Sequence, residues 1–132
     1  MPQPDHSNDL FHLAANYINE TNRHIFLTGK AGTGKTTFLK YIRENTTKNT
    51  VVVAPTGVAA INAGGVTMHS FFQLPFGPYV PSGAHLFGVD NGVTDTHALF
   101  RNIRFNYEKK ELIKEMELLI IDEVSMVRSD TL

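Results

Sequence analysis

One stretch decides the fold: Gly29-Lys30-Ala31-Gly32-Thr33-Gly34-Lys35-Thr36, which matches the pattern G-x-x-x-x-G-K-[ST]. Glycines in this pattern allow a tight turn in which backbone N–H groups point toward a common centre. The apolar run at 24–28 predicts a buried strand before the turn, and the apolar spacing in 35–44 predicts a helix after it. A strand, a glycine-rich turn and a helix in this order are typical of a loop that binds nucleotide phosphates.

The residue types in this loop predict how it would bind ATP and Mg²⁺. Lys35 would reach the β- and γ-phosphates, the Thr36 hydroxyl would ligate Mg²⁺, and Thr37 could hydrogen-bond the α-phosphate. The rest of the loop would contribute its backbone: Gly29, Ala31, Gly32, Thr33 and Gly34. The alternative is a turn that holds nothing, but the pattern should arise by chance in only roughly a few of every thousand chains of this length.

A second apolar run, at 118–121, ends in the acidic pair Asp122 and Glu123. A phosphate-binding enzyme of this type needs a carboxylate near its metal ion and an activated water beside the γ-phosphate. We therefore expect Asp122 to hold Mg²⁺ through water and Glu123 to polarise the attacking water as a catalytic residue, together with Lys35. The alternative is a pair of solvated acids that cap the next helix. The second acid favours hydrolysis, because a nucleotide switch or a kinase can function without it.

Strands and helices alternate along the rest of the chain. The β-branched run at 50–54 predicts a parallel strand buried on both faces, and 58–63 predicts a short helix. Residues 107–117 predict a longer helix with Leu112, Ile113 and Met116 facing inward. The alternation predicts an α/β layered domain with a mainly parallel sheet.

Two further segments complete the predicted domain. Ser7 or Asn8 could cap an N-terminal helix. Its apolar residues recur at helical spacing: Leu10, Leu13, Ala14, Tyr17 and Ile18. The stretch 75–92 is rich in Pro and Gly without clear periodicity, and a loop of this length is usually functional or poorly ordered.

Composition limits the classes of protein to consider. The chain has 132 residues, enough for one domain with an ordinary core, and 42% of them are hydrophobic. Its net charge of −1 gives no global attraction to nucleic acid, so any DNA binding needs a local surface. The chain has no cysteine, which excludes disulfides and thiolate zinc sites. Without a signal peptide or a membrane-spanning apolar run, we expect a soluble intracellular protein, cytoplasmic or nuclear.

The stretch between the two motifs carries candidate nucleic-acid contacts. Residues 54–60 (APTGVAA) follow a buried strand, so we expect them at the same sheet edge as the phosphate loop, where ligands of open α/β sheets bind. Thr56 and the N–H groups of the following helix could hold a backbone phosphate. His69 is either a packed histidine or a ligand. Phe71 and Phe72 could stack on bases, although aromatic residues more often pack in a core.

The order of these motifs is similar to that of a known family. GKAGTGKTT, APTGVAAINAGGVTMHSFF and ELIKEMELLIIDEVSMVRSD resemble the PIF-type (petite integration frequency) DNA helicases, superfamily-one enzymes that move 5′ to 3′ on single-stranded DNA and are related to the RecD-type helicases. The match runs from about residue 25 to the end and is weakest at 75–97. The resemblance implies an ATP-dependent DNA helicase, and it implies that Pro55, Thr56 and His69 lie on the DNA-facing side of the first motor domain.

The resemblance also implies that residues 1–132 are part of the first motor domain, a P-loop NTPase (RecA-like) fold that is incomplete here. In the family a second motor domain with arginine fingers follows, so we expect the chain alone to be inactive or very weak. A strand that normally lies between the phosphate-loop strand and the acidic strand is also missing. We expect a gap in the sheet, closure of the gap, or pairing with another copy of the chain.

One departure from the family concerns base selectivity. Such helicases often have a glutamine upstream that reads adenine, but the only glutamine before the phosphate loop is Gln3, too far away to match well.

The sequence leaves two other functions open. One is a different P-loop enzyme, such as a small kinase or a loader-type ATPase; the other is a non-catalytic module that binds nucleotide or DNA.

Overall fold

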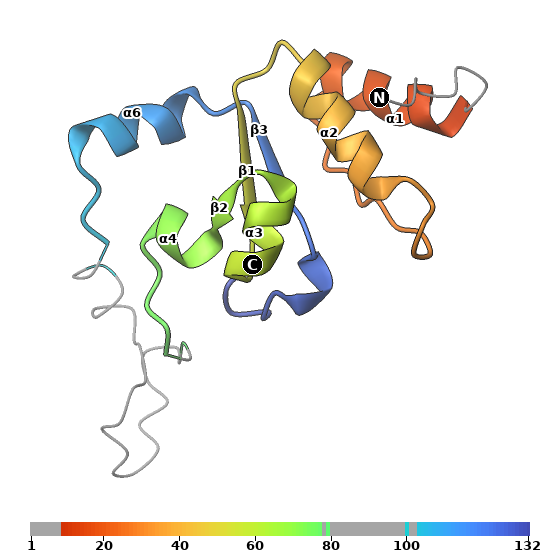
Figure 1. Ribbon diagram of the computed structural model, residues 1–132. Helices are drawn as coiled ribbons and strands as arrows, with labels where there is room; N and C mark the ends of the chain where they lie inside the picture. The colour runs from red at the N-terminus through yellow and green to blue at the C-terminus, as the bar shows by residue number, and fades with distance from the viewer. Residues whose placement is uncertain (1–8, 78, 80–99, 101–102) are drawn as a thin grey trace. The chain divides into compact units, whose positions relative to one another are not determined.

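The computed structural model describes residues 9–77, 79, 100 and 103–132, which fall into two compact units, Met1–Lys48 and Asn49–Leu132. The first unit contains two helices, α1 (Asp9–Glu20) and α2 (Lys35–Asn45), joined by the segment that carries the phosphate loop (Figure 1). The helices predicted from the sequence are thus confirmed. The capping residues Ser7 and Asn8, like Gln3, lie outside the described residues.

Aromatic contacts hold α1 against α2 in the first unit. The ring of Phe11 lies edge-on to Phe38, with 4.9 Å between centroids, and the Phe11 and Tyr41 centroids are also 4.9 Å apart. Phe38 and Ile42 are buried, as expected for the inner face of α2. In α1 the apolar spacing does not identify the buried residues, because Leu10 is 76% exposed while Ala15 is buried.

The strand predicted at 24–28 is wrong: these residues have no regular secondary structure. A strand requires hydrogen bonds to a neighbouring strand, and the other regular elements that the structure describes in this unit are helices. The side chains of the run are accordingly not enclosed, since Ile25 is 41%, Phe26 75% and Leu27 38% exposed. The segment nevertheless leads into the phosphate loop as the motif requires.

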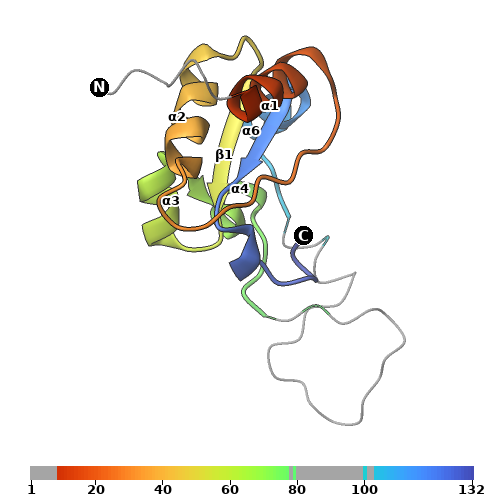
Figure 2. The ribbon, with the colours of Figure 1, turned by 90° about the vertical axis from the view of Figure 1, so that its right-hand side faces the viewer.

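The second unit contains a three-stranded parallel sheet in the order β2-β1-β3, formed by Val66–Thr67, Thr50–Ala54 and Leu118–Ile121. Figure 2 shows β1 and β3 running side by side in the same direction. Their register pairs Val53 with Ile121, and Ala54 pairs with Thr67 on the other side. The predicted parallel sheet and the strands at 50–54 and 118–121 are therefore confirmed.

This register gathers the carboxyl ends of all three strands at one edge of the sheet. Pro55 follows β1, Met68 follows β2 and Asp122 follows β3. The backbone N–H of Asp122 donates to the Val53 carbonyl over 2.9 Å, which fixes the first residue after β3 against β1. Residues far apart in the sequence thus meet at this edge, which we call the strand-end edge.

Short helices follow the strands, and one longer helix precedes β3. They are α3 (Gly57–Ala63), α4 (Met68–Phe72), α6 (Tyr107–Glu115) and the 3₁₀ turn η1 (Val124–Met126). Figure 1 shows α6 leading into β3, as the sequence predicts. In α6, Ile113 packs on the core, but the inward direction expected for Leu112 is wrong, because its side chain is 47% exposed.

The core of the second unit lies under α4. Val53, Met68 and Phe71 are buried there, with exposures of 0%, 3% and 4%. Partly buried residues surround this cluster: Val51, Phe72, Ile113, Leu119, Ile121 and Val127. Phe71 and Phe72 are therefore packing residues, and base stacking by Phe71 is excluded by its burial.

The turn from α3 to β2 depends on the absence of a side chain at Gly65. A Cβ atom at this position would overlap the Val52 carbonyl oxygen and lie 2.7 Å from the carbonyl carbon, closer than such atoms can approach. The backbone of β2 can therefore reach β1 only if residue 65 is glycine.

Among the residues the structure describes, no helix is long and apolar enough to cross a membrane. Most of the stretch 75–92 lies outside those residues.

Candidate nucleotide and strand-end sites

The phosphate loop has the backbone shape that its glycines predict. Gly32 and Gly34 have φ angles of +78° and +88°, in the left-handed region that costs other residues energy. The helix begins directly at Lys35, and the N–H of Phe38 makes an intrahelical bond of 2.9 Å to the Gly34 carbonyl. The unpaired N–H groups of the first turn of α2 are therefore at the loop, where they favour an anion.

Hydrogen bonds within the loop hold Lys35 at its mouth. The Lys35 Nζ donates to the carbonyl oxygens of Gly29, at 2.7 Å, and Lys30, at 2.9 Å. The Thr33 hydroxyl also donates to the Lys30 carbonyl, at 2.8 Å. These contacts place the ammonium group beside the loop backbone.

Thr36 and Thr37 lie on the first turn of α2, and both are exposed. Within the part of the chain that the structure describes, neither hydroxyl is engaged in a hydrogen bond that would keep it from a ligand. A threonine hydroxyl is a hard oxygen ligand of the kind that Mg²⁺ prefers. Thr36 is therefore accessible for the predicted magnesium contact, which stays a prediction.

The acidic pair has an unusual backbone. Glu123 has φ 52° and ψ 41°, a left-handed conformation that is uncommon for a residue with a side chain and that concentrates at functional sites. Its N–H donates to Asp122 Oδ1 over 2.9 Å. The Glu123 carboxylate is exposed and makes no capping hydrogen bond to η1, so it does not cap this turn, and its role in catalysis stays a prediction.

Asp122 also fits a magnesium contact. Its side chain is half-buried at the end of β3, and one carboxylate oxygen is held by the Glu123 N–H. The other oxygen has no hydrogen bond within the described residues and can accept one from a metal-bound water. The same part of the chain contains no group of three His, Asp or Glu that could hold a metal without further ligands.

The predicted DNA-facing residues all lie at the strand-end edge. Thr56 caps α3, with its hydroxyl oxygen accepting from the Ala59 N–H at 3.2 Å, and Thr67 caps α4 in the same way through the Ser70 N–H. Each hydroxyl keeps its own proton, which can be donated to a phosphate oxygen. His69 is half-buried on α4.

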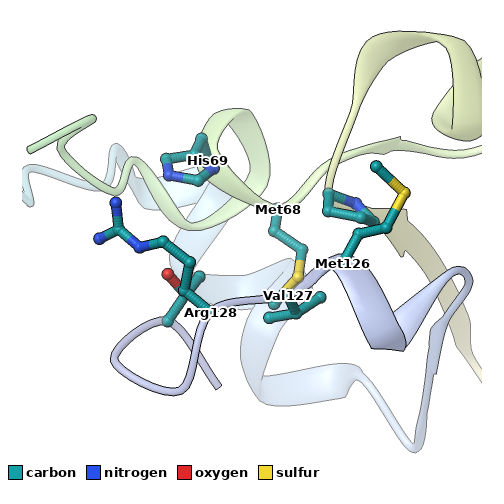
Figure 3. A pocket seen from close by; sticks show the side chains of 7 residues that line it. Met68, His69, Met126, Val127 and Arg128 are labelled. Atoms are coloured by element: carbon teal, nitrogen blue, oxygen red, sulfur yellow. The ribbon is translucent and has the colours of Figure 1, made fainter. Parts of the chain in front are cut away.

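A hollow of about 140 Å³ opens beside these residues. Figure 3 shows His69 and Arg128 at one end of it, Met126 at the other, and Met68 with Val127 between them. Its full lining comprises Pro55, Met68, His69, Met126, Val127, Arg128 and Thr131. Pro55 and His69 were singled out from the sequence, and here they line one surface.

Sequence reasoning missed three residues at this surface: Phe76, Arg128 and Asp130. Phe76 stacks on His69, with ring centroids 5.2 Å apart and an angle of 4° between the planes. Arg128 Nε donates to Asp130 Oδ1 over 2.9 Å. This hydrogen bond, together with the Tyr79 N–H, holds the pKa of Asp130 far below its usual range. The close spacing of Arg128 and Asp130 was the only available signal for the ion pair.

Two features define the class of this protein. A glycine-rich loop that contains Lys35 leads into a helix, and a parallel sheet has a strand that ends in Asp122 and Glu123. These are the features of a P-loop nucleotide-binding α/β protein. Comparison with known families is more specific. The model of the PIF1-like helicases matches residues 5–132, and the chain belongs to this family.

Individual relatives agree with this assignment. The ATP-dependent DNA helicase PIF1 of Candida albicans is 38% identical over 107 residues, which make up 78% of this chain and 10% of that protein. A crystal structure of Bacteroides sp. Pif1 in complex with ADP-AlF4 is 47% identical, with a TM-score of 0.73, and covers 94% of this chain and 25% of its own. Bacteroides Pif1 bound to ssDNA is 48% identical, with a TM-score of 0.71 and the same coverage.

The likeness to the Bacteroides structures bears out the expected RecA-like P-loop fold, with a small and incomplete parallel sheet. The chain spans only a small part of the proteins it matches. It corresponds to 10% of the Candida albicans helicase and 22% of the Pif1 helicase of Bdellovibrio bacteriovorus.

Proposed function

We propose that the chain is the nucleotide-binding part of the first motor domain of an ATP-dependent DNA helicase, which couples ATP hydrolysis to 5′-to-3′ movement on single-stranded DNA. The observation that carries the proposal is the phosphate loop: left-handed Gly32 and Gly34, a helix that begins at Lys35, and a Lys35 ammonium held at the loop mouth. Membership of the PIF1-like helicase family supports the reaction class.

The phosphate loop supplies the binding step of this mechanism. Its N–H groups and the start of α2 hold the phosphates, and Lys35 moves from the carbonyls of Gly29 and Lys30 onto the β- and γ-phosphate oxygens. Thr37 contacts the α-phosphate. Thr36 and Asp122 would hold Mg²⁺, which offsets the phosphate charge when it is bound with ATP.

Glu123 supplies the hydrolytic step. Its carboxylate is exposed and uncommitted to helix capping, so that it can accept a proton from the attacking water. The left-handed backbone at φ 52° ends the extended path of β3 at this residue. Asp122, fixed to Val53 through its own N–H, keeps the pair at the strand end.

Single-stranded DNA is the proposed partner, and its contact surface is the strand-end edge. The hydroxyls of Thr56 and Thr67 and the N–H groups after them would bind backbone phosphates beside Pro55 and His69. The similar Bacteroides Pif1 is bound to single-stranded DNA in one of its crystal structures, which supports the choice of partner. Because the chain is a small part of its relatives, movement along DNA would need the rest of the motor.

The test is ATP hydrolysis by a helicase-length protein that carries this chain, measured with and without single-stranded DNA. We expect DNA to stimulate hydrolysis, and Lys35→Ala or Glu123→Gln to remove the stimulated rate. Hydrolysis that is indifferent to DNA would reject the helicase and favour another P-loop enzyme. Nucleotide binding without hydrolysis would favour a non-catalytic module.

The exposed run Ile25-Phe26-Leu27 supports a second, smaller proposal. The run has no strand partner among the described residues, and an unpaired apolar segment invites association. We propose that it pairs with a further strand, which another copy can supply when none is present in the same chain. Light scattering of the 132-residue chain across a range of concentrations should then show association. A compact monomer at all concentrations would contradict it.

A further inference from the structure

Phe76 is held in a defined position although it is hardly buried. Its side chain is 87% exposed, which means that burial of its apolar surface contributes little to holding it there. Nevertheless its ring is parallel to the His69 imidazole, at 4° and 5.2 Å. The imidazole is parallel to the ring and offset from it, and most of the ring surface is open. A flat aromatic surface that is fixed in orientation and largely open is suited to stacking.

Hydrogen bonds on the α4 side of Phe76 turn the chain back over His69. Gln73 ends α4 in a left-handed conformation, with φ 54°. The N–H groups of Gln73 and Leu74 both point to the His69 carbonyl, with the Leu74 bond measuring 3.0 Å. This reversal brings the following residues back across α4 and explains how Phe76 reaches the imidazole.

An ion pair holds the chain that follows Phe76. Arg128 Nη2 donates to the Gly77 carbonyl at 3.4 Å, and the Tyr79 N–H donates to Asp130 Oδ2 at 3.0 Å. Arg128 and Asp130 also bond each other, through Nε and Oδ1 at 2.9 Å. Arg128 and Asp130 therefore bond the backbone of Gly77 and Tyr79, each of which lies fifty-one positions earlier in the chain.

The groups around the Phe76 ring indicate which ligand it would stack on. His69 lies on the lining of the hollow at the strand-end edge, with Arg128 at the same end (Figure 3). The capping threonines Thr56 and Thr67 at the same edge offer hydroxyls for phosphate groups. The net charge of −1 gives no global attraction to nucleic acid, so binding depends on local contacts at this edge. Stacking on bases, which needs no net positive charge, would be one such contact.

We propose that Phe76, backed by His69, is a base-stacking residue for single-stranded DNA, and that Arg128 and Asp130 are the positioning pair that holds it there. The inference rests on the proposed function. Sequence-independent binding follows, because every base offers a flat face.

The sharpest test uses the absence of tryptophan from the chain. Phe76→Trp places a single tryptophan at the proposed platform, and its fluorescence is titrated with an oligothymidylate and with an abasic oligonucleotide of equal length. We expect the oligothymidylate to quench the fluorescence and the abasic strand to leave it nearly unchanged. Equal quenching by both, or quenching by neither, would overturn the proposal.

Tyr107→Trp is the matched control. Tyr107 is 77% exposed at the start of α6, comparable to Phe76 in exposure, but within the described residues its ring does not stack on another ring as Phe76 does on His69. A tryptophan at this position should be insensitive to both oligonucleotides. If it is quenched as strongly as the one at Phe76, the signal reports nonspecific association, and stacking at Phe76 is refuted.

Affinity measurements separate stacking from simple apolar contact. We expect Phe76→Ala and Phe76→Leu to weaken oligothymidylate binding about tenfold, and Phe76→Tyr to retain it, because stacking requires an aromatic ring. Binding of ATP, measured separately, should be unchanged in all three variants. If Phe76→Leu binds as the original does, stacking is rejected. Wild-type stimulation of ATP hydrolysis by DNA would still support the proposed function in that case, so the two failures are distinguishable.

The positioning pair is tested in the Phe76→Trp background. We expect Asp130→Asn to increase the mobility of the tryptophan, seen as lower fluorescence anisotropy, and to reduce quenching by oligothymidylate about threefold or more. The thermal unfolding midpoint and ATP binding should stay close to those of the parent. Unchanged anisotropy with Asp130→Asn would exclude a positioning role for the pair.

Discussion

The phosphate loop and the strand-end edge are built on opposite principles. The side-chain hydrogen bonds that shape the loop join residues at most six positions apart, as in the bond from Lys35 Nζ to the Gly29 carbonyl. The edge depends on contacts across fifty-one positions, from Tyr79 to Asp130 and from Arg128 to Gly77. The loop is thus specified locally, while the edge exists only once β1, β2 and β3 have assembled.

This difference predicts how each region responds to substitution. A change in the loop should remove nucleotide chemistry and leave the fold intact, since its side chains are exposed or half-buried and support no core. A change in the strands, turns or helix caps that build the edge should cost stability and DNA contacts together, because Val53, Met68 and Phe71 form the core directly beneath it. Substitutions in the two regions can therefore separate the two responses.

The largest expected effect is on catalysis, from Lys35→Ala. Loss of the ammonium removes a fixed donor to the β- and γ-phosphates, which should lower ATP hydrolysis at least about a hundredfold, or about 3 kcal/mol. Lys35 bonds only loop carbonyls in the described structure, so the unfolding midpoint should barely move. Steady-state hydrolysis by a helicase-length protein and chemical denaturation of the same protein measure the two effects.

Lys40→Ala is the control for this prediction. Lys40 is an exposed lysine on the same helix, and its replacement removes the same charge from α2. The hydrolysis rate of this variant should match that of the unsubstituted protein. A comparable loss in both variants would mean that the charge of α2, rather than the position of Lys35, sets the rate, and the local character of the loop would be disproved.

The same contrast explains what the sequence could reveal. The loop, Asp122 and Glu123 could be singled out as candidate site residues because contiguous residues carry their own signal. The helices and the strands at 50–54 and 118–121 followed from apolar runs of ordinary length. The strand at 24–28 did not form, since a pattern of apolar residues cannot provide the neighbour that a strand must bond.

Phe76 shows the limit most clearly. The aromatics singled out in the sequence, Phe71 and Phe72, pack in the core, while the exposed ring is four to five positions further on. Its orientation depends on Gln73 in a left-handed conformation and on an ion pair at the end of the chain. Neither feature leaves a periodic pattern, so only the folded chain reveals the platform.

The largest loss of stability should follow Gly65→Ala. The added Cβ would collide with the Val52 carbonyl group, which forces β2 away from β1 and disrupts the strand-end edge. We expect a loss of about 2 to 3 kcal/mol in the free energy of unfolding. Chemical denaturation monitored by circular dichroism measures it. The matched control is Gly57→Ala, where no atom lies within 4 Å of the new Cβ, and which should be neutral or slightly stabilising.

A smaller effect is expected at the cap of α3. Thr56→Ala removes the acceptor of the Ala59 N–H and should lower the free energy of unfolding by about 1 kcal/mol. Thr56→Ser keeps the hydroxyl and should restore both stability and affinity for single-stranded DNA. If Thr56→Ala weakens DNA binding but leaves unfolding unchanged, the hydroxyl serves the ligand alone, and the expected coupling between edge stability and DNA contact is broken.

Two ion pairs that the structure describes in the second unit provide the smallest and most direct test of the contrast. Glu111–Lys114 and Arg128–Asp130 are both local in sequence, and the first has side chains 36% and 70% exposed on α6. Because Glu111–Lys114 reaches no distant backbone in the described structure, Lys114→Gln should change the free energy of unfolding by at most about 0.3 kcal/mol. It should leave DNA affinity unchanged, whereas Asp130→Asn removes the carboxylate that Tyr79 and Arg128 bond. Titrations of both variants with the same oligothymidylate compare them. Equal effects would show that the reach of the Arg128–Asp130 pair to distant backbone has no functional consequence.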